Sequence, residues 1–164
     1  MTAQHYSGFL RLLRSPVRFR LYLLTQLPSA YFAGLRVVEV DEVGCSVAVP
    51  FKWFTRNPFR STYFACLSMA AEMSTGILAM AAIYRRKPAV SMLVVGLQAS
   101  FHKKATSRTT FVCVDGPAIK DAVAGCIATG EARQVKARTV GTNSNGEIVA
   151  EFIITWSFKA RTHP

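Results

Sequence analysis

The stretch NPFRSTYFACLSMAAE, residues 57–72, opens an apolar segment of the chain that continues to about Tyr84. Glu72 is the only carboxylate within that segment. An isolated acid on an apolar helix is costly to bury unless the protein uses it, so its presence indicates a functional group. Ser61 follows a turn and is a favourable N-cap, which predicts one long helix from about Ser61 to Tyr84.

A helix of this length and composition could also cross a lipid bilayer. Glu72, however, lies near its middle, and an ionised acid at the centre of a bilayer costs several kcal/mol. The sequence contains no second apolar span to pair with this one. We therefore expect a helix buried within the fold, and we expect Pro88 and the cations before it to end that helix.

Length and composition predict a single folded domain over residues 1–164. The chain is 51% hydrophobic and 18% charged, which is unlike a disordered protein and sufficient for one core. Its 20 Lys and Arg against 9 Asp and Glu give a net charge of +11. This excess favours an anionic partner, although solubility alone would also explain it. Nucleic acid is not expected, because the cations are scattered and no aromatic-interleaved binding motif is present.

The cysteines and histidines predict neither a metal site nor a disulfide. The three histidines are not at metal-ligand spacing, and no two cysteines form a Cys-x-x-Cys motif. The cysteines are Cys45, Cys66, Cys113 and Cys126. Reduced thiols in a cytoplasmic protein are the simplest interpretation. We expect Cys66 to pack as a small buried hydrophobe, since no histidine is close to it in sequence.

The first 38 residues carry five arginines and no acid. Apolar side chains recur there at helical spacing and predict an amphipathic helical region over about residues 7–27. They are Leu10, Leu13, Val17, Leu21 and Leu24. A second helix is expected to start at Pro16, capped by Ser15. Three interpretations stay open: a helix packed over the sheet with its arginines in water, a contact with an anionic membrane surface, and an organelle transit peptide.

Runs of alternating and β-branched residues predict strands on both sides of the central helix. The predicted strands cover residues 36–40, 45–51, 92–104, 106–114, 131–142 and 147–159. A short helix is expected over 118–128, closed by Gly130, and the Asn-Ser-Asn-Gly of residues 143–146 predicts a hairpin turn. Segregated helices and strands indicate an α+β fold with a largely antiparallel sheet.

The spacing from Asn57 to Glu72 resembles that of hot-dog fold thioesterases, and most closely an uncharacterised hot-dog family related to the acyl-CoA thioesterases. In that superfamily an asparagine before the central helix is followed on that helix by an aspartate or glutamate in this register. The resemblance covers about residues 27–158 and implies a curved antiparallel sheet wrapped around one long central helix. Many members have His-Gly-Gly where residues 63–65 are Tyr-Phe-Ala, so the acyl-binding geometry here must differ.

The resemblance also implies a reaction: hydrolysis of an acyl-CoA or acyl-carrier-protein thioester, with coenzyme A as part of the substrate and no other cofactor. Glu72 would act as general base or nucleophile, and Asn57 would orient the attacking water or the substrate carbonyl. The backbone N–H groups of Phe64 and Ala65 would stabilise the oxyanion. The candidates for binding the coenzyme A phosphates are Arg56, Arg60, Lys103, Lys104 and Arg108.

Each of these residues also has a structural interpretation. Neighbouring hydroxyls, or a cation across a subunit interface, could satisfy Glu72. Asn57 before a proline is also an ordinary turn residue. For the side chains of Tyr63 and Phe64 we expect core packing. The alternative function is a non-catalytic hot-dog module that binds an acyl chain or a lipid.

A homodimer or a higher even oligomer is expected, with each site built from two chains. A sheet wrapped around one helix leaves edge strands and one flank of the helix uncovered. The segment from residue 57 to residue 84 is apolar nearly all round, so it needs cover on more faces than one sheet provides. A second copy can supply that cover by two-fold symmetry, with the loop of one chain facing the central helix of the other.

Overall fold

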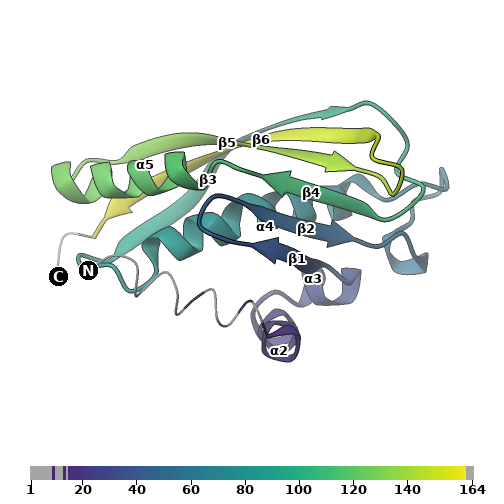
Figure 1. Ribbon diagram of the computed structural model, residues 1–164, viewed down its shortest axis with the longest axis horizontal. Helices are drawn as coiled ribbons and strands as arrows, with labels where there is room; N and C mark the ends of the chain where they lie inside the picture. The colour runs from purple at the N-terminus through teal and green to yellow at the C-terminus, as the bar shows by residue number, and fades with distance from the viewer. Residues whose placement is uncertain (1–8, 10–12, 14, 162–164) are drawn as a thin grey trace.

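A six-stranded sheet curves around one long helix, α4 (Phe64–Ile83), in the computed structural model, which describes residues 9, 13 and 15–161 (Figure 1). The strand order is β1-β2-β4-β5-β6-β3, and every pairing between neighbours is antiparallel. This is the arrangement of the hot-dog fold. The expected α+β class, with an antiparallel sheet wrapped around a central helix, is confirmed.

The six strands and the helix after the fourth strand follow the predicted order, whereas α3 and η1 were not predicted. The strands are β1 (Arg36–Val40), β2 (Cys45–Val49), β3 (Val90–Phe101), β4 (Thr109–Cys113), β5 (Arg133–Thr142) and β6 (Ile148–Ala160). The helices are α2 (Pro16–Gln26), α3 (Pro28–Ala33) and α5 (Gly116–Thr129), and η1 (Trp53–Thr55) is a 3-10 turn. Figure 1 shows α2 and α3 together below the sheet and α5 at the left end of the molecule, where it packs against α4.

The central helix α4 is buried on most of its circumference. Among the described residues it is the one helix long and apolar enough to cross a membrane, and 72% of that stretch is covered by the rest of the protein. Its start differs from the prediction, because α4 begins at Phe64 behind Tyr63, and no side chain caps it. Ser61 is not the N-cap, since its hydroxyl and its N–H are bonded to Asn57 in the preceding turn.

Two polar contacts fix the rotation of α4 against the sheet. The hydroxyls of Ser74 and Thr139 are 2.8 Å apart, and both side chains are fully buried. The indole Nε1 of Trp156 donates to Thr75 Oγ1 at 2.9 Å. Buried hydrogen bonds of this kind are costly to leave unmade, so they select one rotation of an otherwise uniformly apolar helix.

The apolar face predicted for α2 is wrong. Phe19 and Leu23 are buried, whereas Val17 and Leu21 are 79% and 61% exposed. The helix does start at Pro16, as predicted, and a helix that restarts there does not continue the phase of the residues before it. Leu10 and most of the earlier part of the predicted helical region lie outside the described residues.

Phe111 and Gly141 form a tightly packed pair across β4 and β5. A Cβ added at Gly141 would lie 2.6 Å from the ring of Phe111, which is fully buried and has no room to move. We expect Gly141→Ala to lower the free energy of unfolding by about 1–3 kcal/mol through overpacking. Urea unfolding followed by circular dichroism measures the change.

The matched control is Gly125→Ala on α5, where the new Cβ would meet only Arg133 at 3.9 Å. Alanine is the better helix former, so this variant should raise the free energy of unfolding by roughly 0.5–1 kcal/mol. Equal stability losses in the two variants would contradict the packing described at Gly141.

Candidate functional site

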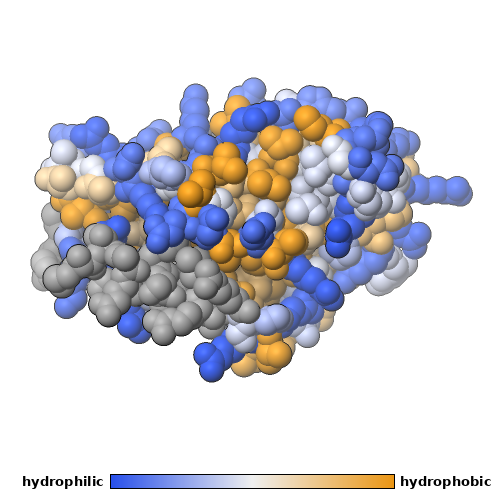
Figure 2. Space-filling model, in the orientation of Figure 1, coloured by the Kyte–Doolittle hydropathy of each residue, from blue (hydrophilic) through white to orange (hydrophobic). Residues whose placement is uncertain are grey.

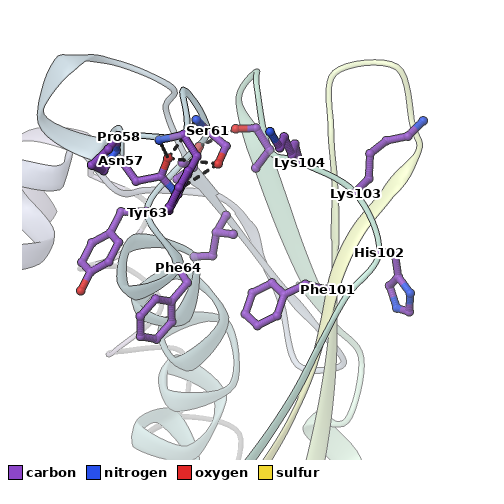
Figure 3. Close-up of a pocket in the computed structure, with 13 residues that line it drawn as sticks. Asn57, Pro58, Ser61, Tyr63, Phe64, Phe101, His102, Lys103 and Lys104 are labelled. Atoms are coloured by element: carbon purple, nitrogen blue, oxygen red, sulfur yellow. Dashed lines mark hydrogen bonds between the residues drawn. The ribbon is translucent and has the colours of Figure 1, made fainter.

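The loop before α4 is held by the side chain of Asn57. Its Oδ1 accepts hydrogen bonds from the N–H groups of Phe59 and Ser61 at 3.0 and 3.1 Å, and its Nδ2 donates to Ser61 Oγ at 3.1 Å. Dashed lines in Figure 3 mark this turn. The structural interpretation of Asn57 as a turn residue is therefore correct. The second N–H of its Nδ2 has no acceptor among the described residues and can donate a hydrogen bond to a ligand.

The N-terminus of α4 is fixed by the strands and loops around it. Thr62 N–H donates to the Ala105 carbonyl at 2.8 Å, and Tyr63 N–H donates to the Thr55 carbonyl at 2.7 Å. Phe64 and Ala65 follow as the first residues of the helix, where N–H groups have no acceptor within the helix. These two groups are therefore free to bind an anionic oxygen at the positive end of α4.

The side chains of Tyr63 and Phe64 are not core residues, so that expectation is wrong. They are 47% and 56% exposed, and their rings meet edge to face with centroids 5.2 Å apart. The reason is that no element among the described residues covers the flank of α4 on which they lie.

A cavity of about 520 Å³ lies between this loop, the start of α4 and the segment after β3. In Figure 3 the rings of Phe64 and Phe101 lie below the Asn57 turn, while His102 and Lys103 point away from it. Other lining residues are Pro58, Phe59, Ser61, Thr62, Tyr63, Leu67, Lys104 and Ala105. The cavity thus combines apolar walls with Asn57 and the N-terminus of α4.

Glu72 lies in a different pocket, of about 250 Å³, between α2, α4 and β3. The walls are apolar except for Tyr22 and Gln26 of α2. Burial raises the pKa of the Glu72 carboxyl, and burial together with the nearby Glu72 raises the pKa of Tyr22. The described residues offer the carboxylate neither a hydrogen bond nor an ion pair. It is therefore an acid poised to take up a proton.

Neighbouring hydroxyls do not satisfy this acid. Ser74 is bonded to the Ala71 carbonyl and to Thr139, and the Ser68 hydroxyl donates to the Phe64 carbonyl. Thr75 donates to the backbone carbonyl of Glu72, not to its carboxylate. The first structural interpretation of Glu72 thus fails within the described residues of this chain.

One chain does not bring Asn57 and Glu72 together. The two pockets share no lining residue, and the eight residues from Phe64 to Glu72 span about 12 Å of helix. The side of α4 that is only half-buried joins the two regions. It carries Ala65, Ser68, Met69, Glu72 and Met80.

The concave face of β3 beside that side of α4 is also uncovered. Leu97 pairs with Ile154 and Phe101 with Ala150, so both point towards the core side of the sheet, yet they are 55% and 52% exposed. An open apolar flank therefore runs between α4 and the edge strand β3.

The five candidate cations for the coenzyme A phosphates are not equivalent. Lys103 and Lys104 both line the cavity, but Lys103 forms an ion pair with Glu147 and its side chain points away from the Asn57 turn. The remaining three, Arg56, Arg60 and Arg108, lie on exposed loop positions. None of these three, nor Lys104, forms an ion pair within the described part of the chain.

The thiols have the surroundings of structural cysteines. All four are free and buried, and burial raises the pKa of Cys66 despite the nearby charge of Lys52. Among residues 9, 13 and 15–161, no cluster of three metal-ligating side chains is found.

Gly76 and the wall formed by α2 were not foreseen from the sequence. A Cβ at Gly76 would lie 3.0 Å from Glu72 Oε1 and 3.3 Å from the Trp156 ring. Because glycine has no side chain, the Glu72 carboxylate can lie against the helix backbone at Gly76, one turn after Glu72 itself. An isolated glycine four residues after the only acid of an apolar helix was the available signal, because glycine costs a helix about 1 kcal/mol.

Comparison with known proteins places the chain in a family. The sequence profile of a domain of unknown function, DUF4442, matches residues 18–158. The chain belongs to the DUF4442 family. No protein with a curated description matches its sequence.

Solved structures with the same fold resemble this DUF4442 chain closely in shape and weakly in sequence. A protein of unknown function from Pseudomonas aeruginosa, described as a probable thioesterase, is 17% identical with a TM-score of 0.75, covering 90% of this chain and 97% of that one. A Haemophilus influenzae thioesterase is 12% identical with a TM-score of 0.62, covering 91% and 94%. The resemblance to the hot-dog superfamily is confirmed at the level of the fold.

The raised pKa of Glu72 predicts a pH-dependent stability. A carboxyl whose pKa in the folded protein exceeds its ordinary value of 4.5 binds more protons folded than unfolded, so stability falls as pH rises through that window. Glu72→Gln mimics the protonated acid, so the variant does not lose stability as the pH rises. We expect it to raise the thermal unfolding midpoint at about pH 8 and to change it little at about pH 4.

Glu147→Gln is the control of opposite sign. The hydrogen bond from Lys103 lowers the pKa of Glu147, so its contribution to stability is present at neutral pH and is lost as pH falls. A Glu72→Gln variant less stable than the parent at about pH 8 would show that the carboxylate is compensated in the folded protein.

Proposed function

We propose that this chain hydrolyses an acyl thioester carried by coenzyme A or by an acyl carrier protein. The observation that carries the proposal is the Glu72 carboxylate, which has no hydrogen-bond or ion-pair partner among the described residues and lies in an apolar pocket on the central helix of a hot-dog fold. Solved structures of the same shape include proteins described as thioesterases, which supports the same reaction class. Free buried thiols support the cytoplasmic location that we propose with it.

In the reaction, Glu72 acts as general base. It takes a proton from a water molecule whose oxygen attacks the thioester carbonyl carbon, and its raised pKa suits it to that step. The carbonyl oxygen becomes an oxyanion that is bound by the free N–H groups of Phe64 and Ala65 in the chain that supplies Asn57, not in the chain that supplies Glu72. The intermediate then expels the thiolate, which takes the proton back from Glu72, leaving a carboxylic acid and a thiol. Direct attack by the Glu72 carboxylate is the other route of this proposal.

The site requires two chains. Glu72 and Asn57 occupy separate pockets of one chain, and the half-buried side of α4 and the concave face of β3 are uncovered between them. A partner related by two-fold symmetry covers that flank and brings its own loop before α4 towards this chain's Glu72. Asn57 of one chain then orients the thioester carbonyl. Glu72 of the other chain activates the water molecule that attacks this carbonyl.

The cations at the mouth of the cavity bind the coenzyme A phosphates in this proposal. Lys104 lines the cavity, and Arg56, Arg60 and Arg108 lie on the surrounding loops without ion-pair partners among the described residues. Lys103 contributes only long-range charge, because Glu147 neutralises it.

Acyl binding without turnover is the second candidate. It is favoured by Phe64, whose ring occupies the space that a glycine would leave open beside the N-terminus of α4. The apolar pocket at Glu72, with Met73, Met80 and Met92 in its walls, would then hold an acyl chain. Native mass spectrometry that finds a bound fatty acid or lipid, with no turnover of any thioester, would favour this function.

Replacing the base tests the hydrolytic function directly. We expect Glu72→Gln to lower kcat/KM by about 10²–10⁴-fold on the acyl-CoA of best chain length, because a general base contributes that much. Release of free thiol from a panel of acyl-CoA and acyl-carrier-protein substrates measures it. Glu131→Gln, an exposed acid on the loop after α5, is the control and should retain activity. Equal turnover by the parent and Glu72→Gln on every substrate would refute Glu72 as the base.

Mixing two inactive variants tests the shared site. Asn57→Ala and Glu72→Ala chains that exchange subunits form mixed dimers with one intact site each. We expect about a quarter of the parent activity to return, because random pairing makes half of the dimers mixed. The control mixes each variant with itself. Recovery that fails after confirmed subunit exchange, or a stable monomer in analytical ultracentrifugation, would rule out a site built from two chains.

A further inference from the structure

One edge of α2 presents apolar side chains to solvent. Leu21 and Leu24, one turn apart, are 61% and 43% exposed, although α2 buries Phe19 and Leu23 on its other side. Figure 2 shows apolar side chains at the lower edge of the molecule, where α2 lies in Figure 1. The helix therefore has two apolar sides, and the described part of the chain covers only one of them.

The apolar edge continues over α3 and η1. The guanidinium of Arg20 stacks on the Tyr31 ring at 4.0 Å and ties α2 to α3. Beside it, Phe32 is 56% exposed, and its ring lies 6.4 Å from that of Phe54 in η1. Trp53, next in sequence, is 80% exposed. We define the docking surface as Leu21, Leu24, Phe32, Trp53 and Phe54.

The aromatic part of the docking surface is held rigidly. Lys52 Nζ donates to the Phe32 carbonyl at 3.1 Å, which joins η1 to α3. Thr55 is fully buried, and its hydroxyl donates to the Pro50 carbonyl at 2.7 Å. Its Oγ1 also accepts the Lys52 N–H at 3.0 Å. The fold thus holds the apolar side chains of Trp53 and Phe54 exposed to water. Such exposure is unfavourable in free energy unless another surface covers them.

The elements that carry the docking surface have cations and no acid, although Glu39 and Asp41, in and after β1, line a cavity together with Val17 and Arg20 of α2. The sequence has no Asp or Glu before Glu39 and none between Val43 and Ala71. Those two segments contain α2, α3, η1 and the loop before α4. Their described cations outside the Tyr31 stack are Arg18, Arg36, Lys52, Arg56 and Arg60.

We propose that the docking surface binds an anionic lipid bilayer. Tryptophan and leucine side chains would enter the interfacial layer, and the arginines and lysine would contact lipid phosphates. A second copy is the poorer occupant, because two-fold pairing would set the cations on and beside α2, α3 and η1 opposite one another, and these three elements carry no acid. The membrane surface that the sequence suggested for α2 alone is here extended to α3 and η1, and it does not depend on thioester hydrolysis.

The two tryptophans give the protein its own reporter. Trp53 is exposed, whereas Trp156 is buried and bonded to Thr75. Adding vesicles of phosphatidylcholine and phosphatidylglycerol to the full chain should shift the Trp53 emission to the blue and shield it from acrylamide. Phosphatidylcholine vesicles alone should do so far less. Trp53→Phe should abolish the shift while flotation still shows binding.

Flotation of variants tests which residues are responsible. We expect Leu21→Ser with Trp53→Ser to lower the vesicle partition coefficient about tenfold or more, since two apolar anchors are lost. Val43→Ser with Val114→Ser, also at exposed positions, is the matched control and should bind as the parent does. Arg18→Gln with Arg56→Gln should weaken binding more than Lys136→Gln with Lys159→Gln, which removes the same charge elsewhere.

Three results would overturn the proposal. The first is no flotation of the parent chain with anionic vesicles at physiological salt. The second is equal loss in the docking-surface variants and their controls, which would mean attraction by net charge alone. The third is an altered oligomeric state of Leu21→Ser with Trp53→Ser in ultracentrifugation without altered flotation, which would mean that a second copy covers this surface.

Discussion

The structure depends on burying α4, a helix that is apolar on nearly every side. One sheet can cover only part of such a helix, so the strands curve and α2, α3 and α5 close most of what remains. Pure apolar packing does not choose a rotation for a helix of this kind. The buried bonds from Ser74 to Thr139 and from Trp156 to Thr75 do so, and they leave Glu72 on the side with the least cover. The same packing of α4 therefore determines both the core and the position of the candidate site.

The cost of Glu72 is what distinguishes a site from a core defect here. A protein selected for stability alone would replace an uncompensated carboxylate in an apolar pocket. The chain instead keeps it, keeps a glycine one turn later that makes room for it, and bonds the hydroxyls of Ser68, Ser74 and Thr75 to other groups. These features support the proposal that Glu72 acts as a base.

The sequence was sufficient for the fold and for the acid, because period-two strands, a long apolar helix and an isolated carboxylate are local signals. It was insufficient for features that depend on which other parts of the protein cover a residue. Ser61 has the chemistry of an N-cap, but Asn57 competes for it in the preceding turn. Val17 and Leu21 follow the apolar spacing of the residues before Pro16, yet the helix restarts there with another phase. Phe64 reads as a core residue, and only the missing cover on one flank explains its exposure.

The pairing of α4 with the sheet also has an evolutionary consequence. Ser74 lies about 200° around the helix from Glu72, nearly on the opposite side, so a change at Thr139 that breaks their contact would let the acid turn away from its pocket. The effects of substitutions at positions 74 and 139 are therefore coupled, and so are those at positions 75 and 156. If Glu72 is the base that we propose, selection on its chemistry extends to these core residues on the far side of the helix.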